Sequence, residues 1–285
     1  MCITNGVKAS LHEAIHGVSM GPRSMLRSAC LAALLLASSF VAANAQMEVK
    51  HAVGALHGFL VIRSEGGVDI GSGEIFAFAE GDRVTIKTVY RFRDGSLDEE
   101  TAIFTQRKTF QLVSDHHIQQ GRFFPKPSDI TVEGNGQVTL RSIDKDGKAK
   151  VETTKMDVSP ALSNGVVGTI LQNITPARPE FKLDMIVPAG KPRAIKLDVV
   201  PVGKQSVRIA GLRRDTTVFR LKTEIGGVAG VIAPIVGKQP PDIFISMIEG
   251  EVPVIVRILG PLAEGTAVVD IQLAGATFPR SPASH

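Results

Sequence analysis

The chain has 285 residues, 44% of them hydrophobic and 21% charged, and its 32 basic and 28 acidic residues give a net charge of +4. A chain of this length and apolar content can bury an ample core. The basic residues are spread singly along the chain without aromatic residues between them, which argues against a nucleic-acid partner.

The first predicted element is an export signal. Residues 23–27 carry two arginines, residues 29–42 form an uncharged apolar run, and an Ala-Asn-Ala triplet ends at Ala45. This order is typical of a leader with a signal-peptidase site, and the apolar run is shorter than the ~20 residues that span a bilayer. We therefore expect removal of residues 1–45 by cleavage between Ala45 and Gln46, and no membrane span afterwards.

Removal of the leader changes the chemistry available to the mature chain. Cys2 and Cys30 are the two cysteines of the sequence, and both lie in the leader, so the mature protein can form no disulfide and no thiolate metal site. Its net charge falls to +2, because three basic residues and one acidic residue are lost with the leader. We expect residues 46–280 to form a single β-rich domain, with the Pro-rich stretch 175–192 as a candidate seam and residues 281–285 as a disordered tail.

The mature chain has the pattern of many short strands. In Arg83–Phe92, hydrophobic residues such as Val84 and Tyr90 alternate with charged residues such as Lys87, which is the period of a strand with one buried face. About ten such strands predict a mainly β fold: a strongly curved antiparallel sheet, either an open barrel or sandwich-like, with one amphipathic helix and a short apolar plug. The other predicted strands are Leu56–Arg63, Gly73–Phe78, Ala102–Thr105, Thr109–Ile118, Ile195–Val200, Thr216–Leu221, Ile243–Ile248, Val254–Leu259 and Thr266–Leu273.

One hairpin can be placed in register from its turn. A three-residue loop at residues 134–136 sets Val132 opposite Val138 and makes both faces of the hairpin consistent. Gly136 then takes the left-handed position of such loops. We expect Gly134 to accept a side chain more readily than Gly136 does.

Two segments depart from the β pattern. Ser159 can cap a helix that starts at Pro160 and carries an apolar stripe with a spacing of four residues, which predicts a surface helix on the sheet. Gly226–Gly237 has no charge and is a poor helix former, so we expect a buried plug over the open face of the sheet. The alternative is a mobile lid over an apolar ligand. The stripe consists of Leu162, Val166, Ile170 and Ile174.

The acidic and histidine runs are the candidates for chemistry. Asp98-Glu99-Glu100 is typical of a solvated acidic turn before a strand, where nothing would remove water from the carboxylates. In Asp115-His116-His117 the two histidines are neighbours on a strand and point to opposite faces, so they cannot easily share a metal, and we expect a half-exposed strand end. Neither a nucleophile elbow nor a phosphate loop is present. We therefore expect no enzyme, no catalytic residue, no metal site and no cofactor.

Turns and core segments near the C-terminus carry a resemblance. Residues 241–245, 250–254, 260–262 and 264–265, with 226–230, 237–241 and 92–97 upstream, resemble segments of a group of uncharacterised bacterial exported proteins. That group in turn is similar to envelope proteins with a strongly curled sheet, including the lipoprotein carriers, whose concave face holds acyl chains. The resemblance implies a curled β fold and a periplasmic or secreted bacterial protein, and it implies no catalytic residue.

These observations leave two main functional hypotheses. The first is an envelope protein that binds an apolar or lipid-like ligand in the hollow of the curled sheet. The second is a structural or protein-interaction module that binds an envelope partner through a strand edge, without a ligand. A cavity of about 300 Å³ or more favours the first hypothesis, and a closed dry core favours the second. The candidate ligand-lining residues, which could equally be ordinary core, are Phe76, Phe78, Tyr90, Phe92, Phe104 and Phe110.

Overall fold

A computed structural model describes residues 46–143, 147–174, 180–189, 191–209, 211–224 and 240–277. The described part is almost entirely β. The strands are β1 (Leu56–Ser64), β2 (Asp69–Glu80), β3 (Arg83–Phe92), β4 (Leu97–Gln106), β5 (Phe110–Gln120), β6 (Ser128–Glu133), β7 (Gln137–Ile143), β8 (Ala149–Lys155), β9 (Phe181–Ala189), β10 (Lys191–Ile209), β11 (Leu212–Glu224), β12 (Ile243–Ile248), β13 (Val254–Pro261), β14 (Val268–Leu273) and β15 (Ala276–Thr277), and the helix is α2 (Val167–Gln172).

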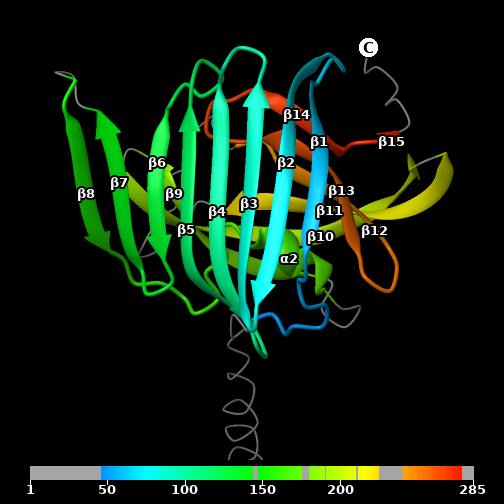
Figure 1. Ribbon diagram of the computed structural model, residues 1–285, viewed down its shortest axis with the longest axis horizontal. Helices are drawn as coiled ribbons and strands as arrows, with labels where there is room; N and C mark the ends of the chain where they lie inside the picture. Colours follow the sequence, from blue (N-terminus) through cyan, green and yellow to red (C-terminus); the bar gives the residue numbers. More distant parts are fainter. Residues whose placement is uncertain are drawn as a thin grey trace, which may run out of the picture. The chain divides into compact units, whose positions relative to one another are not determined.

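The strands form one antiparallel sheet that is not closed. Its order is β15-β10-β11-β12-β13-β14-β1-β2-β3-β4-β5-β6-β7-β8, and β9 pairs with β10 beside this path. The long strand β10 pairs with β11 along one edge, and with β9 and then β15 along the other. In Figure 1 strands β1–β8 make a front layer and β10–β13 cross behind it, with α2 between them. The predicted class, a strongly curved antiparallel sheet with one short helix, is confirmed.

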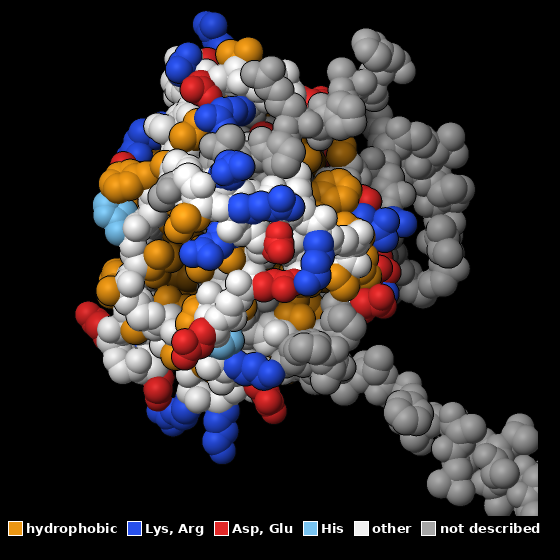
Figure 2. Space-filling model, turned by 90° about the vertical axis from the view of Figure 1, so that its right-hand side faces the viewer, with side chains coloured by type: hydrophobic (Ala, Val, Ile, Leu, Met, Phe, Trp, Pro, Cys, Tyr) orange, Lys and Arg blue, Asp and Glu red, His pale blue; other side chains and the backbone are white. Residues whose placement is uncertain are grey.

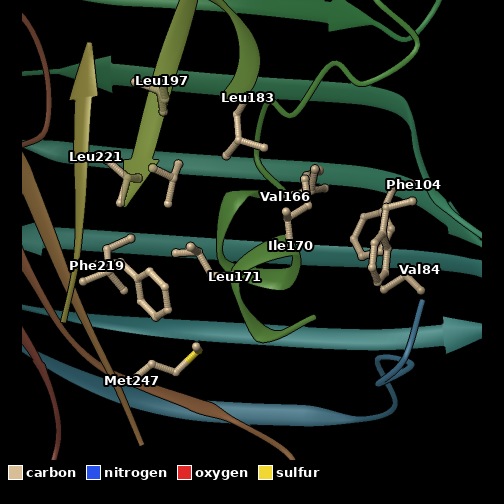
Figure 3. Packing of buried hydrophobic residues seen from close by; sticks show 14 residues of the cluster. Val84, Phe104, Val166, Ile170, Leu171, Leu183, Leu197, Phe219, Leu221 and Met247 are labelled. Carbon is tan, nitrogen blue, oxygen red and sulfur yellow. The ribbon is translucent and has the colours of Figure 1, made fainter. Parts of the chain in front are cut away.

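The curvature lets the two halves of the sheet share one core. Val84 and Phe104 from the front layer belong to the same buried cluster as Leu197, Phe219 and Met247 from β10, β11 and β12. Figure 3 shows these side chains converging from both layers on the helix. Such a cluster removes apolar surface from water on both sides of the helix. Each Å² of apolar surface buried in this way stabilises the fold by about 25 cal/mol.

The predicted hairpin register is confirmed. Val132 pairs with Val138 and Ile130 with Leu140, and Gly136 has a φ of 89°. Gly134 is as crowded as Gly136: a Cβ would lie 1.9 Å from the main-chain oxygen of Leu112 at Gly134 and 2.3 Å from that of Met156 at Gly136. The turn therefore packs against β5 and needs glycine at both positions.

The helix is shorter than predicted, and it lies between the two layers of the curved sheet instead of on the outer surface (Figure 1). The Ser159 hydroxyl does accept a hydrogen bond from the Ala161 amide, but α2 begins only at Val167. Gly165 has a φ of +65°, which interrupts the helical path. Three residues of the predicted stripe are buried nonetheless, and Ile174 packs against the core as a partly buried residue. The buried three are Leu162, Val166 and Ile170.

Three predicted regions cannot be compared with the structure. Gly226–Gly237, the expected plug or lid, lies outside the described residues, as do Ala45 and the tail 281–285. Within the described ranges, no helix is long and apolar enough to cross a membrane. Figure 2 shows one face of the molecule, where acidic and basic side chains are interspersed with hydrophobic ones.

Candidate functional site

Polar side chains interrupt the apolar inner face of the sheet on β4 and β5. The pairing sets Asp98 opposite Gln119 and Glu100 opposite His117, and it sets Asp115 opposite Ala102. Because strand residues two apart share a face, these positions lie in successive rows on one side of the sheet. Toward the other end of the same strands, the inner positions Phe104 and Leu112 belong to the apolar core. We call this set the inner polar cluster: Asp98, Glu100, Asp115, His117 and Gln119.

The expectation of a solvated acidic turn is wrong. Asp98 and Glu100 lie within β4, which begins at Leu97, and the Asp98 side chain is only 6% exposed. Water is removed because the inner face of β4 is covered by segments far along the chain. One of them is the loop after β13, where the main-chain oxygen of Leu262 accepts a hydrogen bond from the Gln119 amide.

Asp98 is fully engaged by its neighbours. The Nε2 atom of His117 lies 2.9 Å from one Asp98 carboxylate oxygen, and the Gln119 amide donates to the other oxygen over 2.8 Å. The Nδ1 atom of His117 lies 3.8 Å from Glu100, too far for a hydrogen bond. The imidazole therefore lies between two carboxylates, bonded to one and open toward the other.

This environment shifts the protonation of the cluster. Desolvation disfavours the His117 cation, but the hydrogen bond to Asp98 and the charges of Glu100, Asp98 and Asp115 outweigh it and raise the pKa of His117 to about 9. Burial raises the pKa of Glu100, with His117 opposing and Asp98 adding to the shift. Burial and the nearby Asp98 and Glu100 charges also raise the pKa of Tyr90 on the neighbouring strand. His117 is therefore a cation at neutral pH.

Asp115 is the most unusual member of the cluster. It is 1% exposed, and in the described part of the chain neither carboxylate oxygen has a hydrogen-bond partner. Burial, then the Glu100 charge, raises its pKa well above the usual range, against the opposing effects of His117 and of the neighbouring Asn164 amide. A buried polar group without a partner costs about 1–3 kcal/mol, and such groups are rare in folded proteins.

The segment before α2 covers Asp115. A Cβ on Gly165 would lie 2.4 Å from the Ala102 Cβ and 2.8 Å from a carboxylate oxygen of Asp115. The side-chain amide of Asn164 holds this segment in place, because it both donates to and accepts from the main chain of Ile186 on β9. Glycine is thus required where the chain passes over the carboxylate.

The two adjacent histidines do point to opposite faces, as predicted. His116 lies outside, 2.9 Å from Asp129, with 43% of its side chain exposed. His117 lies inside, so the expected half-exposed strand end describes only His116. Among the described residues, no group of three or more His, Cys, Asp or Glu side chains could hold a metal ion.

The six candidate ligand-lining residues are not brought together. Phe76 and Phe78 are 37% and 50% exposed and lie on the outer face of β2. Tyr90 and Phe92 belong to a cluster near β14. The remaining pair, Phe104 and Phe110, packs edge to face in the central core.

A groove of 320 Å³ lies elsewhere, beside the first residues of β5. Its apolar floor includes Leu112 and Leu162, which belong to the third buried cluster of the interior. Gln46 crosses it, donating to the main-chain oxygen of Pro160 and accepting a hydrogen bond from Thr109. The groove thus joins a polar rim to the apolar interior. Its lining residues are Gln46, Gln111, Leu112, Gly134, Asn135, Val158, Ser159, Pro160 and Leu162.

Comparison with known proteins identifies no family. No family model matches the chain, and no curated protein matches it. Among solved structures, it is similar to a β-barrel-like protein of the domain of unknown function DUF1849 from Brucella abortus, with 7% sequence identity and a TM-score of 0.44. The match covers 80% of this chain and 99% of the other.

Proposed function

We propose that this chain is an exported protein of the bacterial envelope that binds an amphipathic, lipid-like ligand in the groove beside the start of β5 and catalyses no reaction. The observation that carries the proposal is the 320 Å³ groove, since ligand pockets start at about 300 Å³ and combine an apolar lining with a few polar groups. The leader pattern that ends at Ala45 supports export.

The groove lining suits a ligand with an apolar chain and a polar end. Leu112 and Leu162 are buried and continue into the interior cluster, whereas Gln111 and Asn135 are exposed. An apolar chain on this floor would remove additional apolar surface from water, and the polar rim would remain hydrated. We therefore place the ligand contacts at the groove and not at the six aromatic residues.

Native mass spectrometry of protein purified from the periplasm tests this function. We expect a bound lipid-like mass on the wild-type protein. Gln111→Trp, which introduces a bulky ring at the rim, should lose that mass. The control is Gln120→Trp, an exposed glutamine at the other end of β5, and it should keep the mass. A wild-type protein that carries no ligand and takes up no added decanol would overturn the proposal.

The second candidate function, a protein-interaction module, rests on the edge strand β8. All seven residues of β8 are exposed, and among the described strands β8 ends the sheet and pairs with β7. Such an edge presents unpaired main-chain groups to an incoming strand. A second polypeptide in the mass spectrum that is lost on Val151→Pro, with no lipid mass, would favour this function over ligand binding.

A further inference from the structure

We propose that the end of the β10–β11 hairpin is a docking site for the surface of an anionic phospholipid membrane. We call this end the hairpin tip and define it as residues 206–209 and 211–215. The inference goes beyond the proposed function, because it concerns a different surface and needs no ligand in the groove.

The hairpin tip extends past the strands beside it. β10 and β11 stay paired as far as Ile209 and Leu212. On the β11 side, β12 pairs only from Thr216 onward, and on the β10 side β15 reaches only Arg208 and Ile209. In Figure 1 the yellow end of this hairpin lies at the right, beyond the other strands. The tip can therefore reach a flat surface before the rest of the sheet does.

Three exposed arginines give the hairpin tip a positive charge. They are Arg208 on β10 and Arg213 and Arg214 on β11. Arg208 lies directly opposite Arg213, and like charges in such positions destabilise a hairpin. Asp215 is the one acidic residue in the sequence of residues 206–215. Three positive charges against one negative charge leave an excess of positive charge at the tip.

The hydrogen bonds of two of these arginines leave their charge in place. Arg208 donates to the main-chain oxygen of Gly211 over 3.3 Å, and Arg213 donates to the Ser206 hydroxyl over 3.0 Å. Both acceptors are neutral. Within the described ranges, no acidic side chain forms an ion pair with the arginines of the tip, whereas the Lys204 ammonium on β10 lies 3.0 Å from Glu249. The tip therefore offers guanidinium groups to an external anion.

An apolar side chain lies at the very end of the hairpin tip. Leu212 is 59% exposed. Because residues two apart on a strand share a face, Arg214 projects on the same face as Leu212 and Arg213 on the opposite face. Cations on both faces around a leading leucine suit a tip that enters the headgroup layer end first. The guanidinium groups would then bond to lipid phosphates, for which their fork of donors is well matched.

The size of the hairpin tip favours a lipid surface over a protein partner. A stable protein interface takes about 20–30 residues from each side, and the described tip has nine. A membrane surface needs no shape-matched partner, because each basic residue near anionic lipid adds its own contribution to binding. The exposed leucine adds apolar burial at the interface.

Vesicle flotation of the exported full chain tests the docking site. We compare vesicles of phosphatidylcholine alone with vesicles that contain about 30% phosphatidylglycerol, and expect a partition coefficient about tenfold or more higher for the anionic vesicles. The difference should shrink as salt is raised from about 0.1 M to about 1 M, because salt screens exposed charges. Equal binding to both vesicles, or binding to neither, would overturn this inference and leave the proposed function standing. Binding to polyglutamate without binding to vesicles would overturn it in favour of an acidic protein partner.

Variants of exposed side chains assign the binding to the hairpin tip. Arg213→Gln combined with Arg214→Gln should lower partitioning into anionic vesicles about 25-fold, or about fivefold for each arginine. Leu212→Ser should lower it about threefold or more. The control Arg141→Gln removes an exposed arginine from β7, where Asp129 pairs with it, and should leave partitioning within about twofold of wild type. Unchanged thermal unfolding verifies that the variants fold. Full anionic binding by a folded double-arginine variant would contradict the assignment.

Discussion

The inner and outer faces of β4 and β5 carry the same chemistry in different surroundings. His116 and His117 are neighbours, and each lies 2.9 Å from an aspartate. The outer pair with Asp129 is open to solvent, whereas the inner pair with Asp98 is covered by the distant loop at Leu262. Equal distances therefore do not mean equal energies, because solvent screens an exposed ion pair and leaves a buried one uncompensated when a partner is removed.

The largest expected difference between the two faces is in the stability lost when the aspartate on each face is replaced by alanine. Asp98→Ala leaves the His117 cation and the Gln119 amide without their partner, so we expect a loss of about 3–5 kcal/mol in the free energy of unfolding. Asp129→Ala should cost about 0–1 kcal/mol. Urea unfolding at pH 7 measures both. Similar losses would remove the distinction between the faces.

The next largest expected effect on stability comes from Gly165, in the segment that covers Asp115 on the inner face. Gly165→Ala combines a φ of +65° with a clash against Ala102 and Asp115, and we expect it to cost about 2 kcal/mol or more. Gly147 has a φ of +78° with no atom within 4 Å of its Cβ position, so Gly147→Ala measures the backbone strain alone, about 1 kcal/mol. Thermal or urea unfolding of the two variants separates strain from the clash. Equal costs would mean that Gly165 does not press on the cluster.

The dependence of stability on pH gives a smaller effect. The folded-state pKa of His117 is about 9, above its ordinary value of 6.5, so its stabilisation is complete below pH 6.5 and is lost as pH rises through 9. The raised pKa values of Glu100 and Asp115 act in the same direction, because the folded state holds more protons than the unfolded state. We expect the free energy of unfolding to be about 2 kcal/mol lower at pH 9.5 than at pH 6.5.

Variants of the two histidines test which face causes this loss of stability with rising pH. His117→Gln should flatten the decline between pH 6.5 and 9.5, and His116→Gln should leave it unchanged. Urea midpoints at several pH values suffice for the comparison. Wild-type stability that rises over this interval would show that the inner carboxyl groups and His117 are not perturbed as described.

Local pattern predicted much of the fold and little of the candidate site. Alternation placed β3 and β12 within their observed bounds, and turn chemistry gave the register of the 134–136 hairpin. β8 was not predicted, because both of its faces are exposed and polar residues occupy most of its positions. β9 was missed within the Pro-rich stretch, where Pro188 pairs with Pro192.

The inner polar cluster shows why the site was harder to predict. The sequence indicates that His116 and His117 face opposite sides, but not which side is buried. Burial of Asp98 depends on Leu262, and burial of Asp115 depends on Gly165, and local periodicity does not reveal these distant covers. The available signal was the polar stretch at residues 98–100, which continues in phase with the apolar inner face of β4.

The most direct test of a buried charged cluster on the inner face is an NMR titration of the His117 imidazole in the exported protein. The account predicts a midpoint near 9 for His117, and a lower midpoint in Asp98→Asn, which weakens the hydrogen bond that favours the cation. A wild-type midpoint at or below 6.5 would contradict it, because desolvation would then outweigh the neighbouring carboxylates.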